Sequence, residues 1–149
     1  MKKIFIIEDD TILLRMLERI FVAEDFVVES ALDGADGLAK LYMMNEWPEA
    51  ILLDIMIPIL SGIEVLKLIK NSDRLKSIPV VILSNLTPQP ESEAKIVALG
   101  AEIYLHKTDY TPQLVAKKVI EIIASVAAAS NAQKIDADLV PFPPLPSIS

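Results

Sequence analysis

Short apolar runs alternate along the chain with longer stretches of helical periodicity. The apolar runs are Ile4–Ile7, Phe26–Glu29, Ala50–Leu53, Val80–Leu83 and Ile103–Leu105. Each is rich in aliphatic or β-branched residues and has the length of a strand. The third and fourth runs are apolar at every position of their cores, as expected for strands that are covered on both faces of a sheet.

Five helices are predicted between and after these strands. Apolar residues recur at spacings of three and four over 13–21, 38–44 and 65–69. Ser61 and Glu64 have the spacing of a capping box, which predicts the start of the third helix. Pro90 is suited only to the start of a helix, and Gly100 suits the end of one. Thr111 is the predicted N-cap of the fifth helix.

This alternation predicts an α/β fold, in which a doubly wound, five-stranded parallel sheet lies between two layers of helices. The helical pattern fails near Ser130, and four prolines crowd the segment from Pro141 to Pro146. We therefore predict a domain over residues 1–129 and a flexible, Pro-rich tail over residues 130–149. A PxxP ligand in this tail is a less favoured interpretation.

The composition and net charge of the chain argue against several classes of function. The net charge is -7, and no dense block of Lys and Arg provides the basic surface that binding to nucleic acid or anionic lipid requires. The chain has no cysteine, which excludes disulfides and thiolate metal sites. The apolar run after Lys3 is too short for a signal peptide, which needs about 7 residues or more. These features suit a cytoplasmic protein.

Carboxylates follow two of the predicted strands. Glu8 and Asp9 end the first strand, and Asp54 ends the third, whereas Asp10 is expected to cap the next helix. If the two strands are neighbours, the carboxylates converge at one edge of the sheet and repel one another unless a cation neutralises them. A hard ion such as Mg²⁺ suits such a site, with the backbone carbonyl of Met56 as a further ligand.

Four motifs, taken in order and at their spacings, resemble those of a response-regulator receiver domain over about residues 1–128. They are Ile6–Asp10, Leu52–Pro58 with Ser61-Gly62, Val81–Ser84, and Gly100–Lys107. The resemblance implies a flavodoxin-like fold with strand order 2-1-3-4-5. It also implies a signalling protein of a two-component phosphorelay.

By this resemblance Asp54 is the phosphoacceptor, which takes a phosphoryl group from a phosphohistidine of a histidine kinase or phosphotransfer protein. Asp9 and Asp54 would bind Mg²⁺ with the Met56 carbonyl, and Glu8 would assist through water. Lys107 would supply the counter-charge to Asp54 and then to the phosphoryl group.

The resemblance also implies a switch. Ser84 would donate its hydroxyl to a phosphoryl oxygen, and Tyr104 would turn inward as Ser84 moves. The face formed by the fourth helix, fifth strand and fifth helix would then bind a downstream protein or a dimer mate. His106 is the only histidine, and strand alternation predicts that it faces away from Lys107, which disfavours a phosphohistidine role.

Two other functions compete with this interpretation. A phosphorylation-independent interaction module would be expected to lose acid-cluster residues, and none is missing here. An aspartate-nucleophile phosphohydrolase typically carries a second acid two residues after its nucleophile, and that position is Met56. We therefore expect a phosphoacceptor domain rather than an enzyme.

The chain departs from the family pattern beside the site. Thr108 stands where proline is usual, and Asn85 where a smaller residue is common. Met56 and Leu86 are apolar and cannot orient an attacking water, which predicts slow self-dephosphorylation. The sequence after the fifth helix is shorter than the roughly 60 residues of a DNA-binding module. The chain is thus expected to act by docking, or to be the receiver of a longer regulator.

Overall fold

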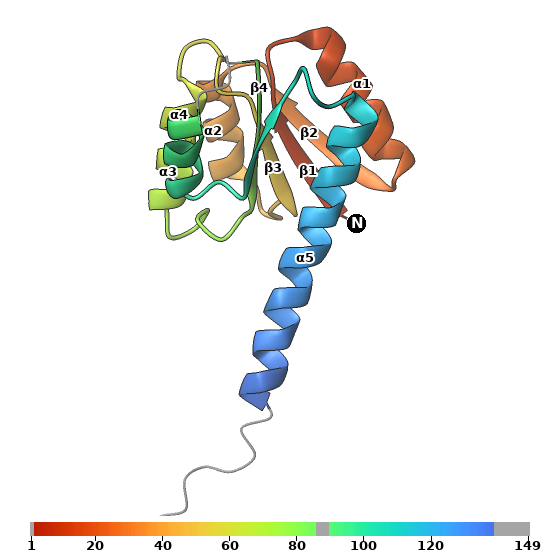
Figure 1. Ribbon diagram of the computed structural model, residues 1–149, viewed down its shortest axis with the longest axis vertical. Coiled ribbons are helices and arrows are strands. Elements are labelled where there is room, and N and C mark those ends of the chain that lie inside the picture. The colour runs from red at the N-terminus through yellow and green to blue at the C-terminus, as the bar shows by residue number, and fades with distance from the viewer. Residues whose placement is uncertain (1, 86–89, 139–149) are drawn as a thin grey trace, which may run out of the picture.

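Five parallel strands in the order β2-β1-β3-β4-β5 form the centre of the computed structural model, which describes residues 2–85 and 90–138 (Figure 1). The strands are β1 (Lys2–Ile7), β2 (Phe26–Ala31), β3 (Ala50–Leu53), β4 (Val80–Ser84) and β5 (Ile103–His106). The helices are α1 (Thr11–Ala23), α2 (Gly34–Met43), α3 (Gly62–Asn71), α4 (Pro90–Ala98) and α5 (Pro112–Asp138). The predicted fold class and strand order are confirmed.

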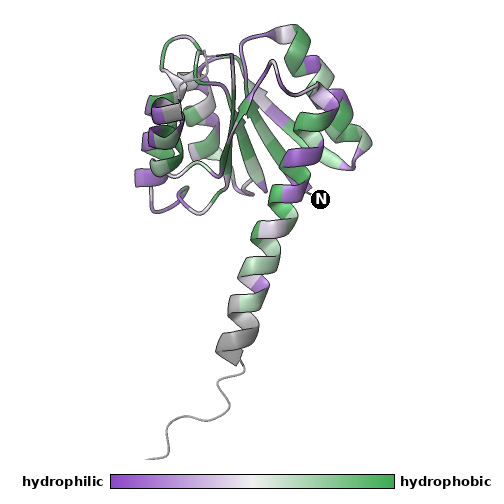
Figure 2. Ribbon diagram, in the orientation of Figure 1, coloured by the Kyte–Doolittle hydropathy of each residue, from purple (hydrophilic) through white to green (hydrophobic). Residues whose placement is uncertain are grey.

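Alternate side chains of each strand enter different cores, because successive residues of a strand point to opposite faces of the sheet. Ile4 and Ile6 pack with α1 and α5, whereas Phe5 and Ile7 pack with α2, α3 and α4. Apolar positions on both faces are therefore buried, which explains why the central strands carry no polar residue until they end. Figures 1 and 2 show the resulting three layers, with green apolar segments lining the sheet.

Side-chain caps start three helices where the sequence predicted them. The Asp10 Oδ1 atom accepts hydrogen bonds from the backbone N–H groups of Ile12 and Leu13, at 3.0 and 3.2 Å. The Ser61 hydroxyl accepts from the N–H of Glu64, and the Thr111 hydroxyl from that of Leu114, both at 3.3 Å. Asp10 is thus occupied as a helix cap.

Helix α5 is longer than predicted. It continues to Asp138 and projects beyond the sheet, and residues 127–132 are all exposed (Figure 1). The expected end of the helical pattern near Ser130 is therefore wrong, although the division into a domain and a tail stays a prediction. The Pro-rich segment lies outside the described residues. No helix in the described part of the chain is long and apolar enough to span a membrane.

The parallel register aligns the strand ends on which the site depends. Ile7 of β1 lies opposite Leu53 of β3, so Glu8 and Asp54 leave neighbouring strands at the same level. Farther along the sheet, Ser84 of β4 lies opposite His106 of β5. The last residues of four strands thus meet along one edge of the sheet.

Candidate functional site

Three carboxylates meet at the carboxyl ends of β1 and β3. Glu8, Asp9 and Asp54 each place a carboxylate oxygen within 4.8 Å of the others. Glu8 and Asp54 are buried, with 2% and 4% of their surface exposed, whereas Asp9 is exposed. The predicted convergence of these acids is confirmed, and Asp9 forms the side of the cluster that is open to solvent.

Lys107 connects the end of β5 to this cluster. Its Nζ atom lies 2.9 Å from Asp54 Oδ2 and 2.9 Å from Glu8 Oε2. The contact with Asp54 was expected from the resemblance, whereas the contact with Glu8 was not predicted. Burial alone would lower the pKa of Lys107, but the hydrogen bonds and negative charges of the two carboxylates outweigh burial and raise it. The ammonium group is therefore charged throughout the neutral range.

One lysine does not offset the negative charge of the cluster. Burial, and then the charge of Asp54, raise the pKa of Glu8 from 4.5 to about 7, against the opposing effects of Lys107 and the backbone N–H of Asp10. The Asp10 N–H donates to Glu8 Oε1 at 3.1 Å. Glu8 consequently holds a proton over part of the neutral range, and a bound cation would compete with that proton.

The donor set of the cluster fits a hard divalent cation. All the side-chain donors are carboxylate oxygens, which Mg²⁺ prefers, and the exposed Asp9 leaves room for the waters that this ion retains. The backbone N–H of Met56 donates to Asp54 Oδ1 at 3.1 Å and holds that carboxylate in place. The Met56 side chain is 62% exposed, and its carbonyl remains a predicted ligand.

The loop that follows Asp54 is held by close backbone contacts. A Cβ atom at Gly62 would lie only 2.2 Å from the Asp54 carbonyl oxygen, so only glycine fits there. Ile59 has a φ of 71°, and the Leu60 N–H donates to the Pro58 carbonyl at 2.8 Å across it. A β-branched residue in this left-handed region is strained. The sequence analysis did not single out Ile59, because nothing in the residue type indicates such a conformation.

Ser84 and Tyr104 lie beside the cluster on β4 and β5. Ser84 is fully buried, and its Oγ atom has no hydrogen-bond partner among the described residues. Burial raises the pKa of the half-buried Tyr104 hydroxyl; the nearby Ser84 opposes this rise, and the charges of Glu93 and Asp54 add to it. The Tyr104 hydroxyl is therefore within electrostatic reach of the carboxylate cluster.

His106 lies on the same face of β5 as Tyr104, while Leu105 between them packs on the other face, as strand alternation predicted. The Tyr104 and His106 ring centroids are 4.9 Å apart, with the rings tilted by 50°. The His106 Nε2 atom contacts the Glu93 carboxylate of α4. This contact was not predicted, since the sequence does not show which helix residue faces the end of β5.

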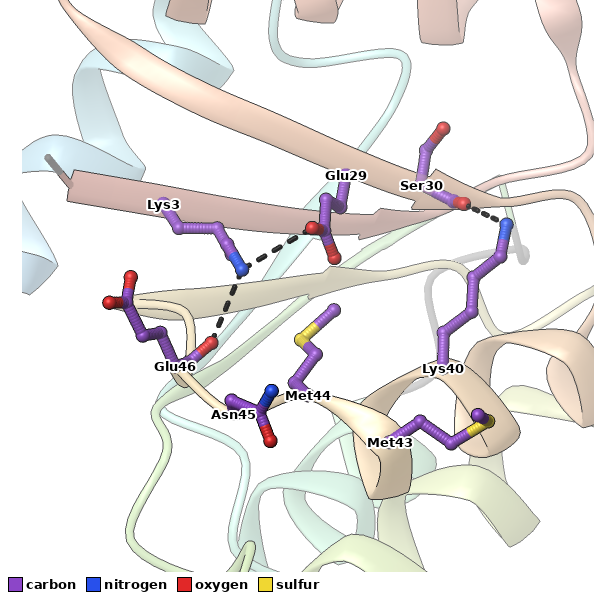
Figure 3. A pocket seen from close by; sticks show the side chains of 8 residues that line it. All are labelled: Lys3, Glu29, Ser30, Lys40, Met43, Met44, Asn45 and Glu46. Atoms are coloured by element: carbon purple, nitrogen blue, oxygen red, sulfur yellow. Dashed lines mark hydrogen bonds and ion pairs between the residues drawn. The ribbon is translucent and has the colours of Figure 1, made fainter.

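The largest hollow described lies elsewhere. It measures about 710 Å³ and is lined by residues of β1, β2, the end of α2 and the loop after it (Figure 3). The Lys3 Nζ atom lies 3.3 Å from both Glu29 Oε1 and the Glu46 carbonyl, and Lys40 donates to the Ser30 carbonyl at 2.8 Å. These charged groups therefore satisfy one another, and the size of the hollow does not indicate chemistry.

Comparison with known proteins identifies the family. A family model described as the response regulator receiver domain matches residues 4–119. The chain is 31% identical over 138 residues to a transcriptional regulatory protein, a CpxR homolog of Haemophilus influenzae, with 91% of this chain and 57% of that protein covered. It is 33% identical over 125 residues to the chemotaxis protein CheY of Treponema pallidum, with 83% of this chain and 81% of that protein covered.

Solved structures show the same likeness. The crystal structure of a CheY-like receiver domain protein from Methanospirillum hungatei superposes with a TM-score of 0.76 at 26% identity, covering 87% of this chain and 98% of that one. A BeF3-activated DrrB receiver domain gives a TM-score of 0.69 at 27% identity, covering 83% of this chain and 98% of that one. The chain spans little more than half the length of several sequence relatives that it matches, such as the CpxR homolog.

Proposed function

This chain belongs to the response regulator receiver family of two-component signalling, and we propose that it accepts a phosphoryl group on Asp54. The donor is a phosphohistidine of a histidine kinase or phosphotransfer protein. The observation that carries the proposal is the buried Asp54 carboxylate, which ends β3 beside Glu8 and Asp9 and bonds to Lys107 at 2.9 Å.

Contacts on both oxygens prepare the Asp54 carboxylate for this transfer. Lys107 donates to Oδ2, and the backbone N–H of Met56 donates to Oδ1, which together fix the orientation of the carboxylate. A carboxylate oxygen attacks the phosphorus atom, an O–P bond forms, and the N–P bond to histidine breaks. The electron pair of the broken bond stays on the imidazole nitrogen, and Asp54 becomes an acyl phosphate.

The acid cluster supports a role for Mg²⁺ in this step. Asp9 and Asp54 would hold the ion directly with the Met56 carbonyl, and Glu8 would assist through water. When bound, the ion offsets negative charge on the transferring phosphoryl oxygens. With a cation in the cluster, Glu8 would give up its proton, because the cation would replace the proton as the neutralising charge.

Two further residues support a readout of the modified state. The Ser84 hydroxyl is buried and has no hydrogen-bond partner among the described residues, so it is free to donate to a phosphoryl oxygen on Asp54. Tyr104 lies next to Ser84, and after burial and Glu93 the charge of Asp54 also contributes to the raised pKa of its hydroxyl. We infer that the face formed by α4, β5 and α5 is the docking surface for a downstream protein or a second copy of the chain.

The acyl phosphate is expected to persist. Met56 follows Asp54 by two positions, is largely exposed at the mouth of the site, and has no group that orients water. Leu86, the other apolar residue predicted to slow hydrolysis, lies outside the described residues. A polar variant, Met56→Asn, should shorten the lifetime of the phosphorylated chain several-fold in a mass-based decay assay. Loss of the wild-type phosphoryl group within seconds would contradict slow dephosphorylation.

The proposed function is tested with Mg²⁺ and acetyl phosphate, and read by intact mass. We expect a gain of one phosphoryl group in the wild-type chain and none in Asp54→Asn or in EDTA. Asp36→Asn is the matched control, because Asp36 is an exposed aspartate that pairs with Lys40 and so should leave phosphorylation unchanged. Absence of the gain with every phosphodonor would instead favour a phosphorylation-independent interaction module.

A further inference from the structure

Helix α4 is attached to the sheet by few side chains. Over residues 91–98 only Ile96 is buried and only Glu93 is half-buried, while the other side chains are exposed. Helix α3 on the same side of the sheet buries Gly62, Val65, Leu66 and Ile69. Any single contact between α4 and the sheet therefore contributes a large share of what holds this helix in place.

Glu93 provides such a contact through His106. The His106 and Glu93 side chains are 15% and 27% exposed, and the Nε2 atom of the ring meets Oε1 of the carboxylate. That carboxylate oxygen is buried and has no hydrogen-bond partner among the described residues, so the ring nitrogen is the polar atom described against it. Without the ring nitrogen, the buried oxygen would lose this contact, which costs stability unless α4 moves away from the sheet.

The same histidine contacts the switch side of the site. Its ring packs on Tyr104 at a centroid distance of 4.9 Å, and its backbone lies opposite Ser84 in the parallel register of β4 and β5. The next residue, Lys107, donates its backbone N–H to the Ser84 carbonyl at 2.9 Å and its side chain to Asp54. A continuous set of contacts thus runs from Asp54 through Lys107, Ser84 and β5 to the first turn of α4.

We propose that His106 is a positioning residue that fastens the first turn of α4 to β5 beside Tyr104. A rearrangement of Ser84 and Tyr104 then moves α4 through the contact between His106 and Glu93. The trigger for this movement rests on the proposed phosphorylation of Asp54, whereas the contact itself does not. The proposal gives the only histidine of the chain a role outside phosphoryl transfer.

A double-mutant cycle on the unphosphorylated full chain tests the contact. His106→Phe keeps a ring against Tyr104 and removes the nitrogen, whereas Glu93→Gln removes the carboxylate charge. We expect each variant to speed amide exchange over residues 91–98 by up to about tenfold, and the double variant to add little, as for residues in direct contact. Glu91→Gln, an exposed glutamate of the same turn, is the matched control and should leave exchange unchanged.

Two outcomes of the cycle would overturn the contact. In the first, the effects of the two single variants on exchange multiply as those of independent sites do; in the second, neither variant changes exchange in α4. His106→Gln keeps an N–H donor for Glu93, so it should restore slow exchange if His106→Phe loosens α4. His106→Leu, which also removes the ring nitrogen, replaces His106→Phe in the cycle if that variant fails to fold.

The transmission is tested by phosphorylation. In the wild-type chain we expect phosphorylation to change exchange over residues 91–98. The His106→Phe variant should take up the same phosphoryl group by mass. Most of the change in amide exchange over residues 91–98 should be lost in it. A change in amide exchange as large as that of the wild-type chain would refute transmission through His106. If the wild-type chain takes up no phosphoryl group, the proposed function and the transmission both fail, and the cycle alone decides whether His106 fastens α4.

Discussion

Lys3 and Lys107 make the same kind of contact at opposite ends of the sheet, with different consequences. Each ammonium group bridges two acceptors from distant segments, and the two side chains are nearly equally exposed, at 17% and 15%. The difference lies in the partners, because Glu29 beside Lys3 is 43% exposed, whereas Glu8 and Asp54 beside Lys107 are almost fully buried.

This difference explains why only one of the two clusters is a candidate site. Water solvates Glu29, so its pairing with Lys3 stabilises the fold by at most about 1 kcal/mol. Water barely reaches Glu8 and Asp54, so their charges must be offset by Lys107, by a proton or by a cation. The buried cluster around Lys107 is therefore sensitive to an added charge such as a cation or a phosphoryl group, whereas water screens the exposed pair of Lys3 and Glu29 from such a change.

The largest expected effect is the loss of phosphoryl transfer when Lys107 is removed. Lys107→Met should slow phosphorylation of Asp54 by about 100-fold, because the developing charge loses its preorganised donor. The initial rate of mass gain with acetyl phosphate measures this effect. Lys3→Met is the matched control and should phosphorylate at the wild-type rate. Equal rates for the two variants would remove the functional distinction between the lysines.

A pH dependence of stability should arise from Glu8. The folded chain keeps the Glu8 proton up to about pH 7, whereas the unfolded chain releases it near the ordinary pKa of 4.5. Between these values the folded state binds more protons, so the free energy of unfolding falls as pH rises and levels off above pH 7. Urea unfolding in EDTA from pH 5 to 8 should show this fall.

Substitution at Glu8 assigns that pH dependence. Glu8→Gln should flatten the profile and make the chain more stable than wild type at pH 8. Glu29→Gln, which changes the solvated cluster, should keep the wild-type slope. A wild-type unfolding midpoint that does not fall between pH 5 and 8 would show that Glu8 is not the group that holds the proton.

Mg²⁺ should produce a smaller stabilisation. At pH 8 a tenfold excess of Mg²⁺ over its dissociation constant would stabilise the folded chain by about 1.4 kcal/mol, and so raise the melting temperature by a few degrees. Asp9→Asn should abolish that rise without lowering the metal-free melting temperature, because Asp9 is exposed and only completes the cluster. An unchanged response to Mg²⁺ in this variant would remove Asp9 from the predicted ligands.

The smallest effect is expected at the other end of the sheet. Lys3→Met should lower the free energy of unfolding by less than about 1 kcal/mol, and the difference should shrink in 1 M salt. Urea unfolding at two salt concentrations measures it. A loss of several kcal/mol would show that the exposed pair behaves like the buried one, and the comparison between the two clusters would fail.

The fold and the acid cluster were predictable for one physical reason. Alternation of strands and helices forces a parallel sheet, and the carboxyl ends of parallel strands share an edge, so Glu8 and Asp54 were expected to meet. The extension of α5 was also signalled, because alanine over 127–129 has the highest helix propensity. It was missed because a helix with no partner loses the apolar periodicity that marks packed helices.

The remaining features depend on packing that the sequence does not display. The contact of Lys107 with Glu8 requires the spacing of β5 from β1 across the sheet, and that of His106 with Glu93 requires the position of α4. The left-handed Ile59 is imposed by the loop around it, since its β-branched side chain disfavours that conformation. Each feature is set by the assembled fold rather than by a local pattern.

The projecting part of α5 has a mechanical consequence. Residues 127–138 rise by about 18 Å beyond the half of the helix that packs on the sheet. If the packed half of the helix tilts, this part moves with it as the arm of a lever. A tilt of about ten degrees sweeps the end through about 3 Å, given the helical rise. Small rearrangements beside the sheet are thereby magnified at the tip of the helix.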